Sequence, residues 1–216
     1  MRKKIILFDW GGVILKQHPN HYSDRDAIVD TLKKFNNKLS YEEAFDAYLK
    51  TIRDKDWRII AVLNDDASRY DWYQRINEKA NLNTSYEEFV EEMINNYKKT
   101  DKYDKVVDFI YTLKDKAKLY LFSDLIFVCY PALAKQIDLK IFDQVFLSYE
   151  EGYIKTELEA FINVDNKLDR QGREVLFIDD YSANIENAKK VGWNTCQTTG
   201  DNVEQIIEVV NKFLEE

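Results

Sequence analysis

Cysteine, proline, glycine and histidine are all scarce in this 216-residue chain, and the shortages exclude several classes of protein. The two cysteines, Cys129 and Cys196, form neither a disulfide framework nor a paired metal-binding motif. We therefore expect both to be reduced thiols packed inside a cytoplasmic protein. With two prolines and six glycines, the chain has no Gly-rich or Pro-rich linker. Domain boundaries must therefore be inferred from the pattern of helices and strands.

Long apolar segments and a basic surface are also missing. The first apolar run, residues 5–8, follows a basic start but ends at Asp9, which makes it too short for an export signal. No other apolar run is long enough to span a bilayer. The formal net charge of −8 provides no basic patch of the kind that binds a phosphate backbone. We therefore expect neither a membrane nor a nucleic acid as a partner.

The chain does contain short apolar runs that each end in a polar residue. Such runs are typical of buried strands in a parallel sheet, which deliver the following residue to one edge. They cover residues 4–8 before Asp9, 118–122 before Ser123, 144–147 before Ser148 and 174–178 before Asp179. Helical patterns lie between and after them, and Gly192 ends the last one. This alternation predicts an α/β fold, a Rossmann-like doubly wound parallel sheet.

Residues 16–99 follow a different pattern, with several amphipathic helices and no convincing strand. We expect this segment to be an all-helical cap domain inserted into an α/β core of residues 1–15 and 100–216. Three helix starts are indicated by capping boxes, formed by Ser23 with Asp26, Ser40 with Glu43 and Ser85 with Glu88. Aromatic residues of the segment could roof a binding site, but packing between its helices is the favoured interpretation. They include Trp57, Tyr70, Trp72 and Tyr73.

A parallel sheet would gather the polar residues at its strand ends along a single edge. Asp9, Ser123 and the pair Asp179 and Asp180 follow three strands directly, and Lys155 lies in the loop after the remaining one. Phosphoryl transfer needs such a set: an attacking carboxylate, a metal bound by acidic groups, and fixed donors for developing charge. Each residue alone has a plainer interpretation, because an acidic residue after a strand often caps a helix and a loop lysine is usually solvated.

Four segments resemble the motifs of the haloacid dehalogenase-like hydrolases, in the order that this superfamily uses. They are residues 8–14 (FDWGGVI), 121–124 (LFSD), 148–161 around Lys155, and 177–193 around Asp179 and Asp180. The resemblance covers the whole predicted core and includes a helical insertion directly after the first motif, which this family uses as a cap. It implies a Mg²⁺-dependent hydrolase that acts on a small phosphorylated metabolite through an aspartyl-phosphate intermediate.

The resemblance also implies a role for each motif residue. Asp9 would be the nucleophile, with Ser123 and Lys155 as the other catalytic residues. The phosphoryl group would be contacted by Trp10, Gly11, Ser123, Asp124 and Lys155. Mg²⁺, which prefers hard oxygen ligands, would be held by Asp9, the carbonyl of Gly11, Asp180 and, directly or through water, Asp179. Asn184 would support these ligands from behind.

One departure from the family pattern bears on activity. Gly11 stands where phosphatases of this family carry a second Asp, which protonates the leaving alcohol and then activates water. Losing such a group typically costs about 10²- to 10⁴-fold in rate. The chain is then a slow phosphatase, one that uses good leaving groups or an acid from the cap, or a protein that binds phosphate without hydrolysing it. Asp124 and Thr156 also replace a frequent Asn and the usual Pro.

Two alternatives stay open. Dehalogenases of the same superfamily also lack the second Asp, but they need no metal, so the pair Asp179 and Asp180 favours phosphate chemistry. A regulatory protein that binds Mg²⁺ and a phosphorylated ligand is the other alternative, and Gly11 is its main support. A nucleotide-binding oxidoreductase is disfavoured because the spaced three-glycine fingerprint is missing. For His18 and His21, the only histidines, a surface role is favoured over catalysis.

Overall fold

A five-stranded parallel sheet forms the centre of the computed structural model, which describes residues 3–17, 19–53, 63–168, 170 and 174–215. The strands are β1 (Ile5–Phe8), β2 (Lys118–Ser123), β3 (Gln144–Leu147), β4 (Val175–Asp179) and β5 (Asn194–Gln197). They lie in the order β3-β2-β1-β4-β5. The predicted parallel α/β sheet is confirmed. The edge strand β5 was not predicted, because its sequence NTCQ is polar and places only Cys196 in the interior.

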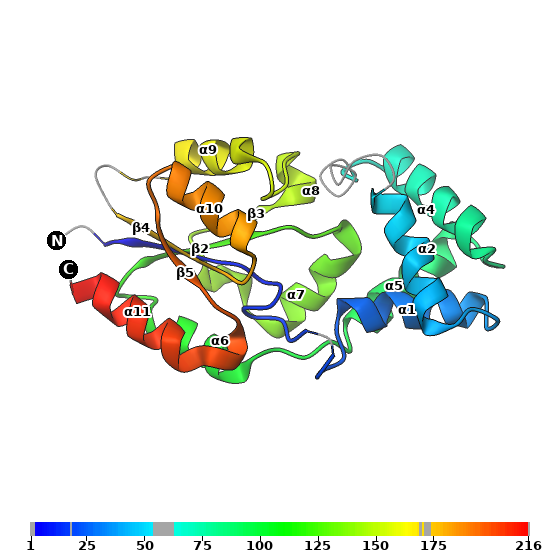
Figure 1. Cartoon of the computed structure of the whole chain (residues 1–216), viewed down its shortest axis with the longest axis horizontal. Coiled ribbons are helices and arrows are strands. Elements are labelled where there is room, and N and C mark those ends of the chain that lie inside the picture. The colour runs from blue at the N-terminus through cyan, green and yellow to red at the C-terminus, as the bar shows by residue number, and fades with distance from the viewer. Residues whose placement is uncertain (1–2, 18, 54–62, 169, 171–173, 216) are drawn as a thin grey trace.

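Helices cover both faces of the sheet (Figure 1). On one face, Ile5 and Leu7 of β1 pack with α9 (Leu158–Lys167) and α10 (Ser182–Lys190). On the other face, Ile6 and Phe8 belong to a core that includes α6 (Asp104–Thr112), α7 (Tyr130–Gln136) and α11 (Val203–Glu215). Because successive side chains of a strand point to opposite faces, β1 must be apolar at every position to serve both cores.

The strand order places the ends of β1 and β4 side by side at the centre of the sheet. From β1 the chain passes to β2 on one side and later returns to β4 on the other, which makes β1 the switch point of the doubly wound fold. Phe8 of β1 pairs with Leu121 of β2 and with Ile178 of β4, and the amide of Asp9 donates to the carbonyl of Ile178 at 2.9 Å. The residues that follow β1 and β4 are therefore neighbours.

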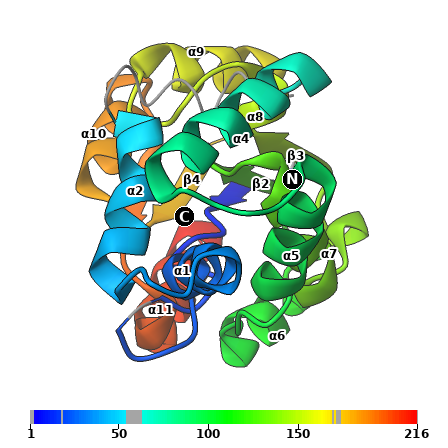
Figure 2. The ribbon, with the colours of Figure 1, turned by 90° about the vertical axis from the view of Figure 1, so that its right-hand side faces the viewer.

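In the described part of the chain between β1 and α6, four helices gather beyond the carboxyl ends of the strands (Figures 1 and 2). They are α1 (Asp24–Phe35), α2 (Tyr41–Arg53), α4 (Asp66–Ala80) and α5 (Tyr86–Tyr97), and we call them the helical insertion. All three predicted capping boxes are confirmed: Asp26 accepts from Ser23, while Glu43 and Glu88 exchange hydrogen bonds with Ser40 and Ser85. That residues 16–99 form a separate cap domain stays a prediction.

An aromatic cluster holds the helical insertion together. Trp72 is fully buried and meets Tyr48, Phe89 and Phe127 edge to face. Phe127 belongs to the short helical turn η1 (Phe127–Cys129) after β2, so this cluster also joins the insertion to the core. Packing is confirmed for Trp72 and for the buried Tyr73, whereas Tyr70 is 51% exposed. Trp57 lies outside the described residues.

The two connections between core and insertion are bonded to each other. Lys16 donates its amide to the carbonyl of Asp101, and Tyr103 donates to the carbonyl of Ile14. Gln136 donates its side-chain amide to Thr100 and accepts from the indole of Trp10. The first motif and both connections therefore share one hydrogen-bonded network. In the part of the chain that the structure describes, no helix is long and apolar enough to cross a membrane.

Truncating Phe161 tests the packing of one sheet face. Phe161 is fully buried against the rings of Phe122, Phe177 and Trp193. Phe161→Ala leaves a cavity, so we expect urea unfolding to show a loss of about 3 to 5 kcal/mol in the free energy of unfolding. Ile162 is the matched control, because it is 44% exposed on the same helix. Ile162→Ala should cost no more than about 0.5 kcal/mol. Equal costs would contradict this packing.

Candidate active site

A cavity of about 570 Å³ lies at the carboxyl edge of the sheet, between the core and the helical insertion. Asp9, Ser123, Lys155 and Asp180 all line it, although they come from four different segments of the chain. Parallel strands explain the gathering: each strand ends at the same edge, and the residue after it faces the space beyond. The structure therefore brings these four predicted residues to one cavity, and the roles expected for them stay predictions.

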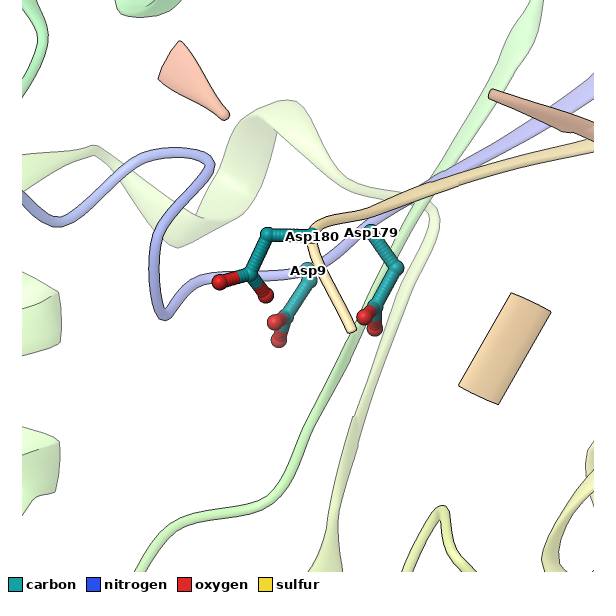
Figure 3. Close-up of side chains that lie close together, drawn as sticks. All are labelled: Asp9, Asp179 and Asp180. Atoms are coloured by element: carbon teal, nitrogen blue, oxygen red, sulfur yellow. The ribbon is translucent and has the colours of Figure 1, made fainter. Parts of the chain in front are cut away.

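Three carboxylates lie together at this edge. Asp9 follows β1, while Asp179 ends β4 and Asp180 follows it, and one oxygen from each residue lies within 4.8 Å of the others. Figure 3 shows the three side chains close together at the ends of neighbouring strands, with Asp180 and Asp179 on either side of Asp9. Three ionised carboxylates in a buried edge repel one another, so the cluster needs positive charge nearby to remain ionised.

Lys155 supplies positive charge at the cluster. Its side chain is 2% exposed, and its ammonium lies 2.7 Å from Asp9 Oδ1 and 2.7 Å from Asp179 Oδ2. Burial alone would lower the pKa of Lys155, but the carboxylates of Asp179 and Asp9 outweigh it and raise the pKa above its usual value. Lys155 is therefore a fixed cation, and it balances only one of the three negative charges.

The backbone amide and carbonyl of Lys155 are also hydrogen-bonded. Both carboxylate oxygens of Asp124 accept from the Lys155 amide, at 3.1 and 3.0 Å. The Lys155 carbonyl accepts from the side-chain amide of Asn187 on α10. The loop after the short helix α8 (Ser148–Glu151) is thereby tied to the end of β2 and to α10. Asp124 was expected to contact phosphate, but its charge opposes that role, and phosphate contact by Asp124 stays a prediction.

The two residues of the acidic pair have different surroundings. Asp179 is fully buried, and its carboxylate accepts from the Tyr181 amide, the Asn184 side chain and Lys155. These donors occupy most of its lone pairs, which favours a role in holding Lys155 and Asn184 in position. Asp180 is only partly buried and lines the cavity. Burial and the neighbouring Asp179 raise the pKa of Asp180 to about 6.

The nucleophile candidate has one bonded and one unbonded oxygen. Asp9 Oδ1 accepts from the Trp10 amide at 2.7 Å and contacts the Lys155 ammonium. Within the described residues, Oδ2 accepts no hydrogen bond, so a lone pair remains for attack or for a metal ion. Burial raises the pKa of Asp9 above its usual value, and Lys155 opposes the shift. A second cation at the cluster would favour the ionised, nucleophilic form.

The residues present fit a magnesium ion. Carboxylate oxygens of Asp9 and Asp180 are hard ligands at the cavity wall. Lys155 leaves two of the three negative charges uncompensated, and a divalent cation would balance them. Asn184 adds an independent sign: its Oδ1 is buried without a hydrogen-bond partner among the described residues, although Asn184 lines the cavity. Such an acceptor is usually satisfied by an ion's hydration shell or a bound ligand. Ligation by the Gly11 carbonyl stays a prediction.

The glycines of the first motif leave room for these carboxylates. Gly12 has φ +72°, and a Cβ atom there would collide with the carboxylate of Asp180. Any other residue at this position would therefore be strained and would displace Asp180. At Gly11 the described atoms that a Cβ atom would meet are Gln17 Nε2 at 3.7 Å and Asp9 Oδ2 at 3.9 Å, which are ordinary contacts.

Two further sets of predicted residues can be placed. The Ser123 hydroxyl is buried at the end of β2 beside the cavity. The Trp10 amide donates to Asp9. The contacts of both groups with a phosphoryl group stay predictions. His21 packs edge-on against Tyr103 with 6.3 Å between ring centroids and does not line the cavity. His18 lies outside the described residues.

Sequence reasoning missed the cavity residues that the insertion and its connection contribute. Among them are Gln17, Asp24, Tyr48 and Tyr97, and the buried thiol of Cys129 lies on the same wall. For Tyr48, the sequence predicts no more than a place in one of the amphipathic helices of residues 16–99. Its hydroxyl was the available signal, because a tyrosine on a packing face carries a polar group that needs a partner.

Comparisons with known proteins agree with this architecture. A family model for haloacid dehalogenase-like hydrolases matches residues 3–192. The fold is similar to HAD family enzyme bt-2542 from Bacteroides thetaiotaomicron, with a TM-score of 0.71 and 21% identity over 96% of this chain and 99% of that chain. The same enzyme in complex with magnesium and inorganic phosphate has a TM-score of 0.65 and 19% identity, covering 91% and 94% of the two chains.

Two other solved structures share the fold. A predicted HAD-like family hydrolase from Porphyromonas gingivalis has a TM-score of 0.68 and 16% identity over 99% of this chain and 98% of that chain. The L-2-haloacid dehalogenase from Xanthobacter autotrophicus, with chloropropionic acid covalently bound, has a TM-score of 0.62 and 14% identity, covering 91% and 77%. The curated proteins give no match.

Removing the buried cation tests the charge balance of the site. Lys155→Met leaves Asp9 and Asp179 buried without their ammonium, so we expect the free energy of unfolding to fall by about 3 to 5 kcal/mol. In Lys155→Met/Asp179→Asn, one of the uncompensated charges is also gone. Urea unfolding of the double variant should therefore show a smaller loss than the sum of the two single variants. Strictly additive losses would mean that Lys155 does not stabilise Asp179.

Proposed function

Because the chain belongs to the haloacid dehalogenase-like hydrolases, we propose that it is a Mg²⁺-dependent phosphatase of small phosphorylated metabolites. The observation that carries this proposal is the carboxylate of Asp9 beside that of Asp180 at the cavity wall. One Asp9 oxygen is paired to Lys155, and the other accepts no hydrogen bond from the described residues. An acidic pair beside the nucleophile supports metal-assisted phosphate chemistry over metal-independent dehalogenation. The binding of magnesium and inorganic phosphate by bt-2542 adds support from a protein of the same fold.

The chemistry would proceed in two displacements. In the first, Asp9 Oδ2 forms a bond to phosphorus while the bond from phosphorus to the leaving alkoxide breaks. Lys155 holds Oδ1 and supplies positive charge, and the Ser123 hydroxyl donates to a phosphoryl oxygen. In the second, water attacks the aspartyl-phosphate and returns Asp9 to its carboxylate form.

A metal ion would bind the carboxylate cluster on the side that Lys155 does not occupy. Asp9, Asp180 and the Gly11 carbonyl would hold Mg²⁺, with Asp179 oriented behind them by Tyr181 and Asn184. When bound, the ion would neutralise charge on the phosphoryl oxygens and so lower the barrier to attack by an anionic carboxylate. No carboxyl group stands at position 11 to protonate the leaving oxygen, which favours substrates with good leaving groups.

The cavity also favours substrates without a second negative charge. Of the described residues that line it, Lys155 alone carries a positive charge, whereas Asp24, Asp124 and Asp180 are acidic. The wall away from the carboxylates is largely apolar, formed by Ile28, Phe45, Leu49, Leu125, Ile126 and Ile154. A bisphosphate or a phosphorylated acid would bury a second anion here without a cation to pair with it among the described lining residues. We therefore favour monophosphates of neutral or cationic alcohols.

The proposal is tested by hydrolysis of p-nitrophenyl phosphate with Mg²⁺ or with EDTA. We expect slow hydrolysis that needs Mg²⁺ and falls to background in Asp9→Asn, because the attacking carboxylate is gone. Gly11→Asp should raise turnover by up to about 10²-fold, since it supplies the missing acid and its Cβ atom fits. Circular dichroism should show that both variants remain folded.

The outcomes separate the alternatives. Turnover of 2-chloropropionate that EDTA leaves unchanged would replace the phosphatase by a dehalogenase. Measurable Mg²⁺ binding by calorimetry without hydrolysis of any phosphate ester would support a binding protein instead. Hydrolysis of p-nitrophenyl phosphate that persists in Asp9→Asn would contradict Asp9 as the nucleophile.

A matched pair of aryl phosphates tests the preference for charge. We expect kcat/KM for 4-carboxyphenyl phosphate to be at least about 10-fold below that for phenyl phosphate, which corresponds to about 1.4 kcal/mol of repulsion. Asp24→Asn should narrow this gap, because Asp24 lines the cavity beyond the catalytic cluster. Equal kcat/KM values for the two esters would show that the acidic lining does not select substrates.

A further inference from the structure

The space beside Gly11 contains a polar side chain from the connection to the insertion. A Cβ atom at Gly11 would lie 3.7 Å from Gln17 Nε2 and 3.9 Å from Asp9 Oδ2, so the amide and the nucleophile flank the same point. From Gly12, the same Gln17 nitrogen is 3.0 Å from a Cβ position that would also collide with Asp180. Gln17 therefore stands where an acid at position 11 would project.

Gln17 is available to a ligand at this place. It lines the cavity, and its amide makes no hydrogen bond to the residues that the structure describes. The chain directly before it is fixed, because Leu15 pairs with Gly11 and Lys102, and Lys16 donates to Asp101. A side chain on an anchored backbone needs to order only its own torsions to reach the site, which limits the entropic cost.

A carboxamide can do part of what the missing acid does. It cannot give or take a proton at neutral pH, but it offers two N–H donors and one carbonyl acceptor. A glutamine that accepts from a water molecule and donates to a phosphoryl oxygen orients that water for attack, as in the GTPases. Orientation without proton transfer accelerates hydrolysis less than a general base, in keeping with a slow phosphatase.

We propose that Gln17 orients the water that hydrolyses the aspartyl-phosphate and so replaces, by hydrogen bonding, the acid that Gly11 lacks. This inference rests on the proposed phosphatase function. In the step, the water oxygen bonds to phosphorus, the bond from phosphorus to Asp9 breaks, and Asp9 leaves as a carboxylate. Both water protons remain on the product, which departs as dihydrogen phosphate. Gln17 holds the water throughout and exchanges no proton.

Rapid mixing with p-nitrophenyl phosphate separates the two displacements. Phosphorylation of Asp9 releases p-nitrophenolate in a burst, whereas hydrolysis of the intermediate sets the steady state. Gln17→Ala lacks one orienting hydrogen-bonding group, so its steady-state rate should be about 10-fold below that of the wild-type protein. Its burst rate should change less. The variant should also accumulate acid-trapped phosphoenzyme. Asn20→Ala is the matched control, since Asn20 is an exposed carboxamide of the same connection that does not line the cavity.

Gly11→Asp provides a second readout. If Gln17 replaces the missing acid, restoring that acid makes the amide dispensable. Gly11→Asp/Gln17→Ala should then turn over as fast as Gly11→Asp. This cycle would not respond to a merely structural role, because a folding defect caused by Gln17→Ala would persist in the double variant.

The result can also overturn the inference. The role of Gln17 would be contradicted if Gln17→Ala turned over at the same rate as Asn20→Ala. It would also be contradicted if the variant slowed the burst and the steady state equally and accumulated no phosphoenzyme. Neither result would contradict the proposed phosphatase function. A wild-type protein that forms no Mg²⁺-dependent phosphoenzyme would remove the proposed function itself, and the role of Gln17 with it.

Discussion

The buried ammonium of Lys155 is the constraint on which the site depends. A buried cation is stable only when it is paired, and its partners, Asp9 and Asp179, follow or end the neighbouring strands β1 and β4. The loop that carries Lys155 must therefore return to the centre of the sheet, where Asp124 and Asn187 hold its backbone. The interaction that closes this edge of the fold uses Oδ1 of Asp9, and among the described residues no group donates to Oδ2. Under the proposed function, this ion pair would serve both stability and chemistry.

The acidic pair is divided by the same constraint. Because Asp179 is occupied by Lys155, Tyr181 and Asn184, its negative charge is used inside the protein. The carboxylate of its neighbour Asp180 shares none of these donors within the described residues. It occupies the space that Gly12, with its positive φ, leaves empty. Two consecutive aspartates thus take different roles, since successive residues at a strand end face different directions.

The sheet and the candidate site at its edge were predictable because both follow from local pattern. Each apolar run of the four predicted strands ends at the residue that the sheet delivers to its edge, which is how Asp9, Ser123 and Asp179 could be identified. The strand β5 lacked such a run, since its pairing with β4 is imposed by the neighbouring strand and not by its own residues. Cavity residues such as Gln17 and Tyr48 were missed because periodicity identifies a buried face but not the cavity that the packed helices enclose.

The charges around position 11 explain why a glycine there favours ionisation of Asp9. A carboxylate there would be a further negative group beside Asp9 and Asp180, in a cavity where Lys155 is the one cationic side chain among the described lining residues. Each added negative charge makes Asp9 harder to ionise. A neutral amide from Gln17 can donate and accept hydrogen bonds at the same place without adding charge. Under the proposed function, glycine at position 11 would favour the ionised form of Asp9 at the expense of fast proton transfer. This would suit substrates whose leaving group departs readily.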